Sequence, residues 1–184
     1  MYLTKNDDEL VALADESIRL FGAFTFGEKR EIYICAPRKI KKLHITLAHE
    51  MTHLIYIVET KDQGEKIPTW IHEGLAVYEE GKFDDTRLGS MNAYIEEEIA
   101  QGRFTAIRDL AMDPSTFEAI DSFYIESMSI VSFMVDTYGM NKLMSFSQKL
   151  KDGQDIDSAI KNTYSPKMKS VDDFEKQWID SIKK

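Results

Sequence analysis

The sequence predicts an α+β fold that is mostly helical, with a small N-terminal β-sheet packed on one long helix and a helical C-terminal part. Apolar residues recur every three or four positions along most of the 184 residues, which is the period of an amphipathic helix. Only before Pro37 do short segments rich in aromatic and β-branched residues indicate strands. A chain of this length suits a single domain, residues 1–184, with parts at about 1–82 and about 83–184.

The first part begins with a helix and a hairpin. Residues from about Asp7 to Leu20 place apolar positions among acidic ones, which predicts a helix. Phe24–Phe26 and Glu31–Cys35 flank a Gly27-Glu28-Lys29 turn, so we expect a short hairpin or two edge strands. Cys35 is the only cysteine, which excludes an intrachain disulfide. Its apolar neighbours predict a buried small hydrophobe rather than a nucleophile.

The segment from about Lys39 to Val58 is the clearest helix in the sequence. Its large apolar residues recur at intervals of three or four, which predicts an interior helix with one apolar stripe. The residues of this stripe are Leu43, Leu47, Met51, Leu54, Ile55 and Val58.

Helices are expected along the rest of the chain. Pro68 opens the first of them and Gly81 ends it. Asp121 or Ser122 can cap the longest one, and Gly139 can end it. The expected ranges are about Thr69–Glu80, Met91–Gln101, Asp121–Thr137, Leu143–Leu150, Asp157–Asn162 and Ser170 to the end.

The net charge of −9 comes from 32 acidic and 23 basic residues. Because phosphate binding needs clustered lysine and arginine, this balance argues against a nucleic-acid partner. The short basic cluster at Arg38, Lys39, Lys41 and Lys42 is interpreted as the solvated start of a helix. No segment reaches the roughly 18 apolar residues that span a bilayer, and the first residues lack the apolar core of a signal peptide. If the chain is complete, we expect a cytoplasmic protein without a membrane partner.

The pentapeptide His49-Glu50-Met51-Thr52-His53 lies within the clearest helix. Histidines four positions apart on a helix project about 40° from one another, so both imidazoles can reach one ion. Glu50 lies beside them, where it can contact a metal-bound water without binding the metal. A charged side chain in an otherwise apolar helix also needs a polar partner or a functional reason. This H-E-x-x-H arrangement of zinc hydrolases predicts His49 and His53 as zinc ligands.

A catalytic zinc usually takes a third protein ligand. The glycine and third histidine that extend the motif in some enzymes are absent, because Tyr56 and Glu59 hold their places. Glu73 is available on the expected downstream helix. Gly74 and Ala76 are small, which would let that helix approach the first one closely and bring Glu73 opposite the histidines. The sequence therefore favours one zinc per chain, held by two histidines and Glu73.

His72 is the rival for the third position because it is adjacent to Glu73. On a helix the two side chains point about 100° apart, so both cannot face the same zinc. We favour Glu73 as the ligand and expect His72 in the wall of a substrate cleft. The neighbouring Glu79-Glu80 pair is interpreted as a solvated helix end.

The H-E-x-x-H motif followed by P-x-W-I-x-E-G-L-A at Pro68–Ala76 resembles the gluzincin peptidases, specifically the peptidase MA-like domains. The likeness covers roughly Glu31 to Ile182, and it implies a zincin-like fold. Further residues that carry it are Phe123–Ser129, Phe133, Tyr138-Gly139, Ala159 and Phe174–Trp178.

The resemblance implies one more functional residue. The family often places a tyrosine hydroxyl near the zinc, where it stabilises an oxyanion, and Tyr124 matches that position by its sequence context. Two features depart from the family's pattern. The region before the active-site helix is short, so the sheet is expected to be reduced. Glu126 stands where a glutamine or another neutral residue is expected.

Together these residues predict zinc-dependent hydrolysis of a peptide or protein substrate. A zinc-activated water would attack the peptide bond, with Glu50 as the general base. The first alternative is a catalytically weak or inactive zinc-binding scaffold of the same fold, which an occluded cleft would favour. The second is a helical interaction module without a metal.

Overall fold

The computed structural model describes residues 1–14, 16, 18, 21–39, 42–61, 66–112 and 115–183. Leu20, Lys41 and the side chain of Arg38, which enter the sequence-based expectations, lie outside the described part.

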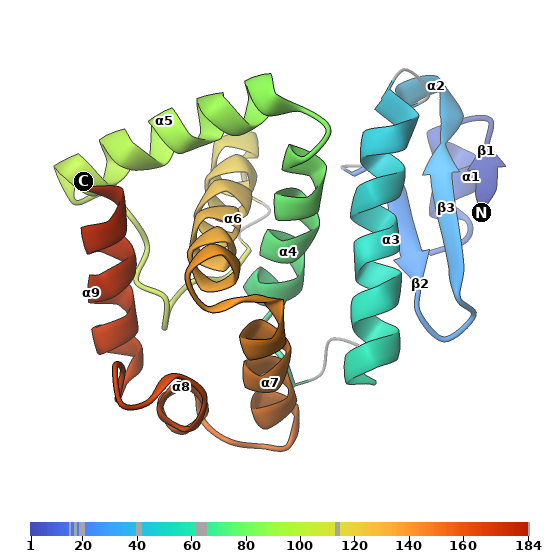
Figure 1. Cartoon of the computed structure of the whole chain (residues 1–184). Helices are drawn as coiled ribbons and strands as arrows, with labels where there is room; N and C mark the ends of the chain where they lie inside the picture. The colour runs from blue at the N-terminus through green and yellow to red at the C-terminus, as the bar shows by residue number, and fades with distance from the viewer. Residues whose placement is uncertain are drawn as a thin grey trace.

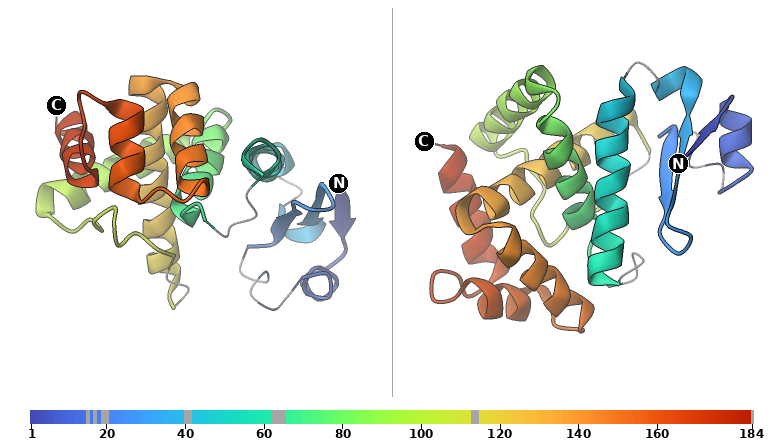
Figure 2. Two further views of the ribbon diagram at one scale, coloured as in Figure 1. Left: turned by 90° about the horizontal axis from the view of Figure 1, so that it is seen from below. Right: turned by 45° about the vertical axis from the view of Figure 1, so that its right-hand side comes forward.

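The molecule consists of a small sheet, the helix α3 beside it, and a body of further helices (Figure 1). Seen along its axis, α3 lies between the sheet and the helical body (Figure 2). This arrangement confirms the predicted α+β, mostly helical fold with its N-terminal sheet on a long helix. The elements are β1 (Tyr2–Thr4), α1 (Asp7–Val11), β2 (Ala23–Phe26), β3 (Glu31–Cys35), α2 (Ala36–Lys39), α3 (Leu43–Thr60), α4 (Thr69–Gly81), α5 (Asp85–Gln101), α6 (Phe117–Tyr138), α7 (Met140–Lys151), α8 (Ile156–Tyr164) and α9 (Val171–Ile182).

The sheet has the strand order β1-β3-β2. β2 runs antiparallel to β3, with Ala23 opposite Ile34, which confirms the predicted hairpin. β1 runs parallel to β3, with Leu3 opposite Ile34. β1 was not predicted, because a three-residue strand is too short to show alternation. One face of the sheet packs on α3 through Ala23, Ile32, Ile34, Leu43, Leu47 and Leu54.

The first helix is shorter than predicted. The side chain of Asn6 caps α1, which ends at Val11 rather than continuing to Leu20. The amides of Leu13 and Ala14 bond to carbonyls three residues back, and this tighter geometry closes a helix end.

α3 is less enclosed than the sequence predicts. It ends at Thr60, where Lys61 takes a left-handed conformation with φ 54°, a common way to stop a helix. Half of its apolar stripe is exposed, because Met51 is 40% exposed, Ile55 56% and Val58 39%. The expectation of an interior helix is therefore wrong for this side. The small sheet covers the half of the stripe at Leu43, Leu47 and Leu54, and α4 covers another side of α3, which leaves the other half of the stripe in solvent.

α4 crosses α6 at very short range. A Cβ atom added at Gly74 would lie 2.3 Å from the backbone oxygen of Ser127 and 2.8 Å from Cγ2 of Val131. Such a separation admits only glycine. The small residues of α4 were expected to contact the histidine helix, but Gly74 faces α6 instead. Its neighbour Glu73 is thereby fixed in position by the core of the helical body.

The remaining helices lie close to their predicted places. α5 and α6 begin earlier than predicted, because each has an upstream cap. The side chain of Asp84 accepts a hydrogen bond from the amide of Arg87 at α5, and Thr116 accepts one from Ala119 at α6. α7, α8 and α9 confirm the three C-terminal pieces.

Two smaller expectations concern burial and the membrane. Cys35 is 1% exposed, which confirms that it is a buried small hydrophobe. Among the described residues, no helix is both long enough and apolar enough to cross a bilayer.

Candidate metal centre

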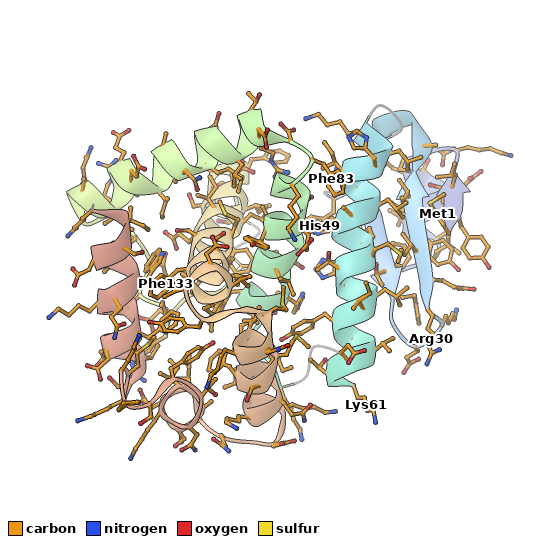
Figure 3. All side chains as sticks on the ribbon, in the orientation of Figure 1. Met1, Arg30, His49, Lys61, Phe83 and Phe133 are labelled. Atoms are coloured by element: carbon orange, nitrogen blue, oxygen red, sulfur yellow. The ribbon has the colours of Figure 1, made fainter. Side chains whose placement is uncertain are left out.

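α3 presents His49 and His53 toward α4. Because the two residues are four positions apart, their side chains emerge from the same face of the helix. Their Nε2 atoms lie 3.0 Å apart, and their rings meet nearly edge to face at an interplanar angle of 79°. Figure 3 shows the labelled His49 between α3 and α4. Both imidazoles therefore face the same small space.

Glu73 reaches this space from α4. Its Oε2 atom lies 3.5 Å from Nε2 of His49 and 3.4 Å from Nε2 of His53. The three residues form the one group of metal-ligand type found within the described ranges, with all donor atoms within 4.8 Å of one another. The structure thus brings together the three residues that the sequence predicts as ligands.

The spacing of these donor atoms fits a tetrahedral ion. At zinc–donor distances of about 2.0–2.1 Å, two ligands of a tetrahedron lie about 3.3 Å apart, close to the three observed separations. In addition, Oε2 of Glu73 is buried and has no hydrogen-bond partner in the described part of the chain. A buried carboxylate oxygen that accepts no hydrogen bond is costly unless positive charge neutralises it. The site can therefore hold a metal ion.

The electrostatics of the centre also favour a cation. Burial lowers the pKa of His49, but the carboxylates of Glu73 and Glu80 outweigh it and raise the pKa to about 10. Burial raises the pKa of Glu73, but His53 and His49 more than offset it and hold the pKa of this carboxyl well below its usual range. The protein groups thus stabilise positive charge between α3 and α4.

Glu50 lies beside the donor atoms and is 5% exposed. The hydroxyl of Thr25 lies 2.7 Å from Oε2 of Glu50 and 2.9 Å from its backbone oxygen, so one donor is shared between two acceptors. Thr25, on β2, is thus the polar partner that a charged residue in this helix requires. Burial raises the pKa of Glu50, against the opposing effect of His49 and His53.

α6 brings Tyr124 to the same place. The ring centroid of Tyr124 lies 6.4 Å from that of His49. Burial raises the pKa of Tyr124 above its usual range, and the carboxylates of Glu73, Glu50 and Glu80 raise it further. The hydroxyl therefore keeps its proton at neutral pH and can donate a hydrogen bond. The structure places Tyr124 as expected, and its part in chemistry stays a prediction.

His72 lies behind the donor atoms rather than among them. Its Nδ1 atom is 3.3 Å from Nδ1 of His53, which is on the opposite side of that ring from the Nε2 donor. It is also 3.7 Å from Oε1 of Glu73. His72 lines the cleft around the centre, as the sequence analysis expected.

Glu80 is the residue of this site that the sequence analysis missed. Its Oε1 atom lies 2.8 Å from Nδ1 of His49, at an angle that makes a close charge contact rather than an aligned hydrogen bond. Arg87, in the first turn of α5, pairs with the other oxygen. Burial opposes ionisation, but His49 and Arg87 hold the pKa of Glu80 below its usual value.

A carboxylate behind a ligating histidine fixes the orientation of its ring. Glu80 is not the solvated helix end that the sequence suggested. Two turns of helix separate it from Glu73, which puts both residues on the face of α4 that meets α3. This spacing is the signal that could have identified Glu80.

The centre lies in a cleft with a volume of about 610 Å³, a size common for ligand sites. Its walls come mainly from β2, α3, α4 and the first turns of α6. The lining includes the three donor residues. It also includes Glu50, His72 and Tyr124.

Comparison with known proteins identifies the family. A family model of the peptidase MA superfamily matches residues 19–184. The chain belongs to the peptidase MA superfamily. No curated protein and no solved structure matches it. In this member of the peptidase MA superfamily, the matched range contains the whole donor group, whereas β1 and α1 precede it. The membership confirms the resemblance to peptidase MA-like domains that the two motifs predict.

Proposed function

We propose that this member of the peptidase MA superfamily is a zinc-dependent peptidase that holds one zinc ion through His49, His53 and Glu73. The observation that carries the proposal is the spacing of their donor atoms, at 3.0, 3.5 and 3.4 Å, beside Glu50 in an accessible cleft. When bound, zinc supplies the Lewis acidity that polarises a carbonyl and lowers the pKa of a water to about 7.

Glu50 acts as the general base in this proposal. Its carboxylate takes a proton from the attacking water and delivers it to the amine that leaves. Thr25 holds one carboxylate oxygen, and the other accepts no hydrogen bond from the described residues, so it can face the water. The raised pKa of Glu50 supports this role, because a base is most effective when its pKa lies closer to the working pH.

Tyr124 completes the proposed site. Since its hydroxyl keeps its proton, it donates a hydrogen bond to the oxyanion that develops on the carbonyl of the scissile bond. Donors of this kind stabilise the transition state most when they are already in place and shielded from water. The packing of Tyr124 beside His49 supports such a fixed position.

An inactive zinc-binding scaffold of the same fold is the alternative. It would be favoured by a segment of the protein lying across the donor atoms. Within the described ranges no segment fills the cleft of about 610 Å³, which supports a site that admits a peptide or protein substrate.

The decisive variant is Glu50→Gln, because it removes the base and keeps the ligands. We expect one zinc per chain by elemental analysis and a fall of about 10²–10⁴-fold in the cleavage of a fluorogenic peptide library. Glu59→Gln, an exposed carboxylate on the same helix, serves as the control and should change neither quantity. Undiminished cleavage by Glu50→Gln would refute the assignment of the base.

The ligand set is tested separately with Glu73→Ala. We expect this variant to lose zinc on dialysis and to melt at the temperature of the chelator-treated parent protein. Full zinc retention would return His72 to consideration as the third ligand.

A further inference from the structure

One face of α6 overhangs the cleft. Phe117, Ile120, Asp121 and Tyr124 all line it, and their spacing of three or four positions places them on one side of the helix. Ile120 is buried and Tyr124 is half-buried, whereas Phe117 and Asp121 are exposed. This face therefore runs from the metal centre at Tyr124 to the solvent at Phe117.

The carboxylate of Asp121 neither caps a helix nor forms an ion pair among the described residues. The helix start is capped by Thr116, and Glu118 supplies the acidic residue of the first turn. The residues three and four positions away from Asp121 on both sides are not cationic, so no helical ion pair can form. Among the described residues, its carboxylate has no hydrogen-bond or ion-pair partner.

The other acidic residues of the cleft are engaged. Glu73 and Glu80 contact the histidines, and Glu50 accepts the hydroxyl of Thr25. Of the two basic residues in the lining, Arg87 pairs with Glu80 and Lys39 has an interaction of its own. Asp121 is thus a negative charge in the described cleft that its neighbours leave uncompensated.

Phe117 stands one helical turn from Asp121 and is 71% exposed, more than any other large apolar side chain in the described part of the chain. Residues four positions apart on a helix are neighbours, about 5–6 Å apart at Cβ. An exposed aromatic ring beside a carboxylate suits a side chain with an apolar stem and a cationic head. Lysine and arginine bury their methylene groups on apolar surfaces in this way. Their positive charge is also attracted to the face of an aromatic ring.

We propose that Asp121 and Phe117 form a subsite that selects peptide substrates with a lysine or arginine side chain near the cleaved bond. The proposal rests on the peptidase function proposed above and adds the class of substrate. The cationic head pairs with the carboxylate of Asp121, and the stem lies along the ring of Phe117.

The distance of the subsite from the metal centre limits how far the basic residue of the substrate can lie from the cleaved bond. Asp121 precedes Tyr124 by three residues, a rise of about 4.5 Å along the helix, and Tyr124 lies 6.4 Å from His49 between ring centroids. Taken end to end, these two distances place the subsite about 11 Å from the ring of His49, which an extended peptide covers in about three residues. We expect the preference for lysine or arginine within three residues of the cleaved bond, on one side only.

The test compares peptides that differ by one charge. Fluorogenic peptides carry lysine or its uncharged analogue norleucine at each of three positions on either side of the bond. For the zinc-loaded protein we expect the ratio of kcat/KM for lysine to that for norleucine to exceed one at one position. Asp121→Asn should lower this ratio about fivefold, as for a well-placed exposed ion pair, and high salt should lower it too. Glu118→Gln, an exposed carboxylate of the same helix that does not line the cleft, should leave the ratio unchanged.

A binding arm separates this proposal from the peptidase function. The zinc-loaded Glu50→Gln protein is titrated with the lysine and norleucine peptides, followed by fluorescence anisotropy, with and without Asp121→Asn. Loss of lysine preference on Asp121→Asn supports the subsite even if the parent protein cleaves no peptide. Cleavage with equal ratios for the parent and Asp121→Asn overturns the subsite and leaves the peptidase function standing. Tighter binding of lysine peptides that persists in Asp121→Asn also overturns it.

Discussion

α3 and α4 both bring donor atoms to the metal centre, but the molecule holds them in different ways. α4 is locked into the helical body, where Gly74 lets its backbone approach α6 to a separation that no Cβ could share. α3 rests with one side on a small sheet, and its stripe at Met51, Ile55 and Val58 is exposed. Close packing therefore fixes the position of Glu73. The two histidines lie on a helix with fewer packed neighbours, so packing constrains their positions less.

Polar contacts compensate in part for the weaker packing of α3. The Nζ atom of Lys151 on α7 donates to the backbone oxygen of Thr60, the last residue of α3, at 2.6 Å. Just before the other end of α3, Lys42 lies 3.2 Å from Asp84. In the middle, Glu80 reaches across from α4 to His49. Packing therefore positions Glu73, and directed charge contacts help to position the two histidines.

The largest effect on stability is expected from a substitution in the close contact between α4 and α6. Gly74→Ala forces a methyl group against the backbone of Ser127, and rigid helices cannot relieve this clash locally. We expect a loss of about 1–3 kcal/mol in the free energy of unfolding, measured by urea denaturation of the metal-free protein.

Gly89→Ala is the matched control for this change. Gly89 lies within α5, and an added Cβ would meet nothing within 4 Å. Because alanine is the better helix former, this variant should gain about 1 kcal/mol. A similar response of the two variants would show that the crossing of α4 and α6 is not as tight as described.

The contribution of the charge contacts to the position of His49 is tested with Glu80→Gln. The substitution keeps the shape of the side chain and removes the charge that faces His49 and Arg87. We expect zinc affinity to fall about 10- to 100-fold, measured by competition with a chelator, with little loss of stability in the metal-free protein. Glu79→Gln removes an ion pair of the same helix, to Lys82 at 2.7 Å, outside the cleft. An equal loss of affinity in both variants would exclude orientation of His49 as the cause.

The smallest effect is expected at Glu126, on α6. This residue is 4% exposed, and one of its oxygens accepts the amide of Thr105 at 3.1 Å. The other oxygen has no hydrogen-bond partner among the described residues. Burial raises its pKa above the ordinary 4.5, so the fold prefers the protonated carboxyl. That contribution is complete below about pH 4.5 and is lost as the pH rises through the folded-state pKa.

Glu126→Gln should therefore stabilise the metal-free protein at neutral and alkaline pH, by about 1 kcal/mol. The difference in Tm between variant and parent should grow from pH 4 to pH 8, and zinc affinity should not change. A constant difference across this range would mean that the carboxyl does not titrate as described. A carboxyl at this position, where the sequence led us to expect a neutral residue, should therefore lower the stability measurably at neutral pH.

Much of this architecture could be predicted because it is periodic. The helix with His49 and His53, the helix with Glu73 and the C-terminal helices all repeat apolar residues at helical spacing. The candidate donor group could be predicted because the four-residue spacing of the histidines and the glutamate after Trp70 impose a geometry by themselves. Tyr124 depended on the family resemblance, since no spacing rule singles out one tyrosine among eight.

The features that escaped prediction depend on contacts between distant segments. The exposure of Ile55 could not be foreseen, because periodicity gives the apolar side of a helix but not the extent of what covers it. Glu80 looked like a solvated helix end, and only the approach of α3 turns it into a partner of His49. Gly74 was correctly seen as a site of close approach, but the sequence did not identify α6 as the helix that approaches.

The strand β1 has a consequence for shortened forms of the protein. The family match begins at residue 19, and a chain trimmed to that boundary would lack β1. The edge of β3 that pairs with Tyr2–Thr4 would then present a row of unsatisfied amide and carbonyl groups, with the apolar Ile34 at its centre. Open edges of this kind recruit strands from other molecules, so trimming to the family boundary would favour self-association.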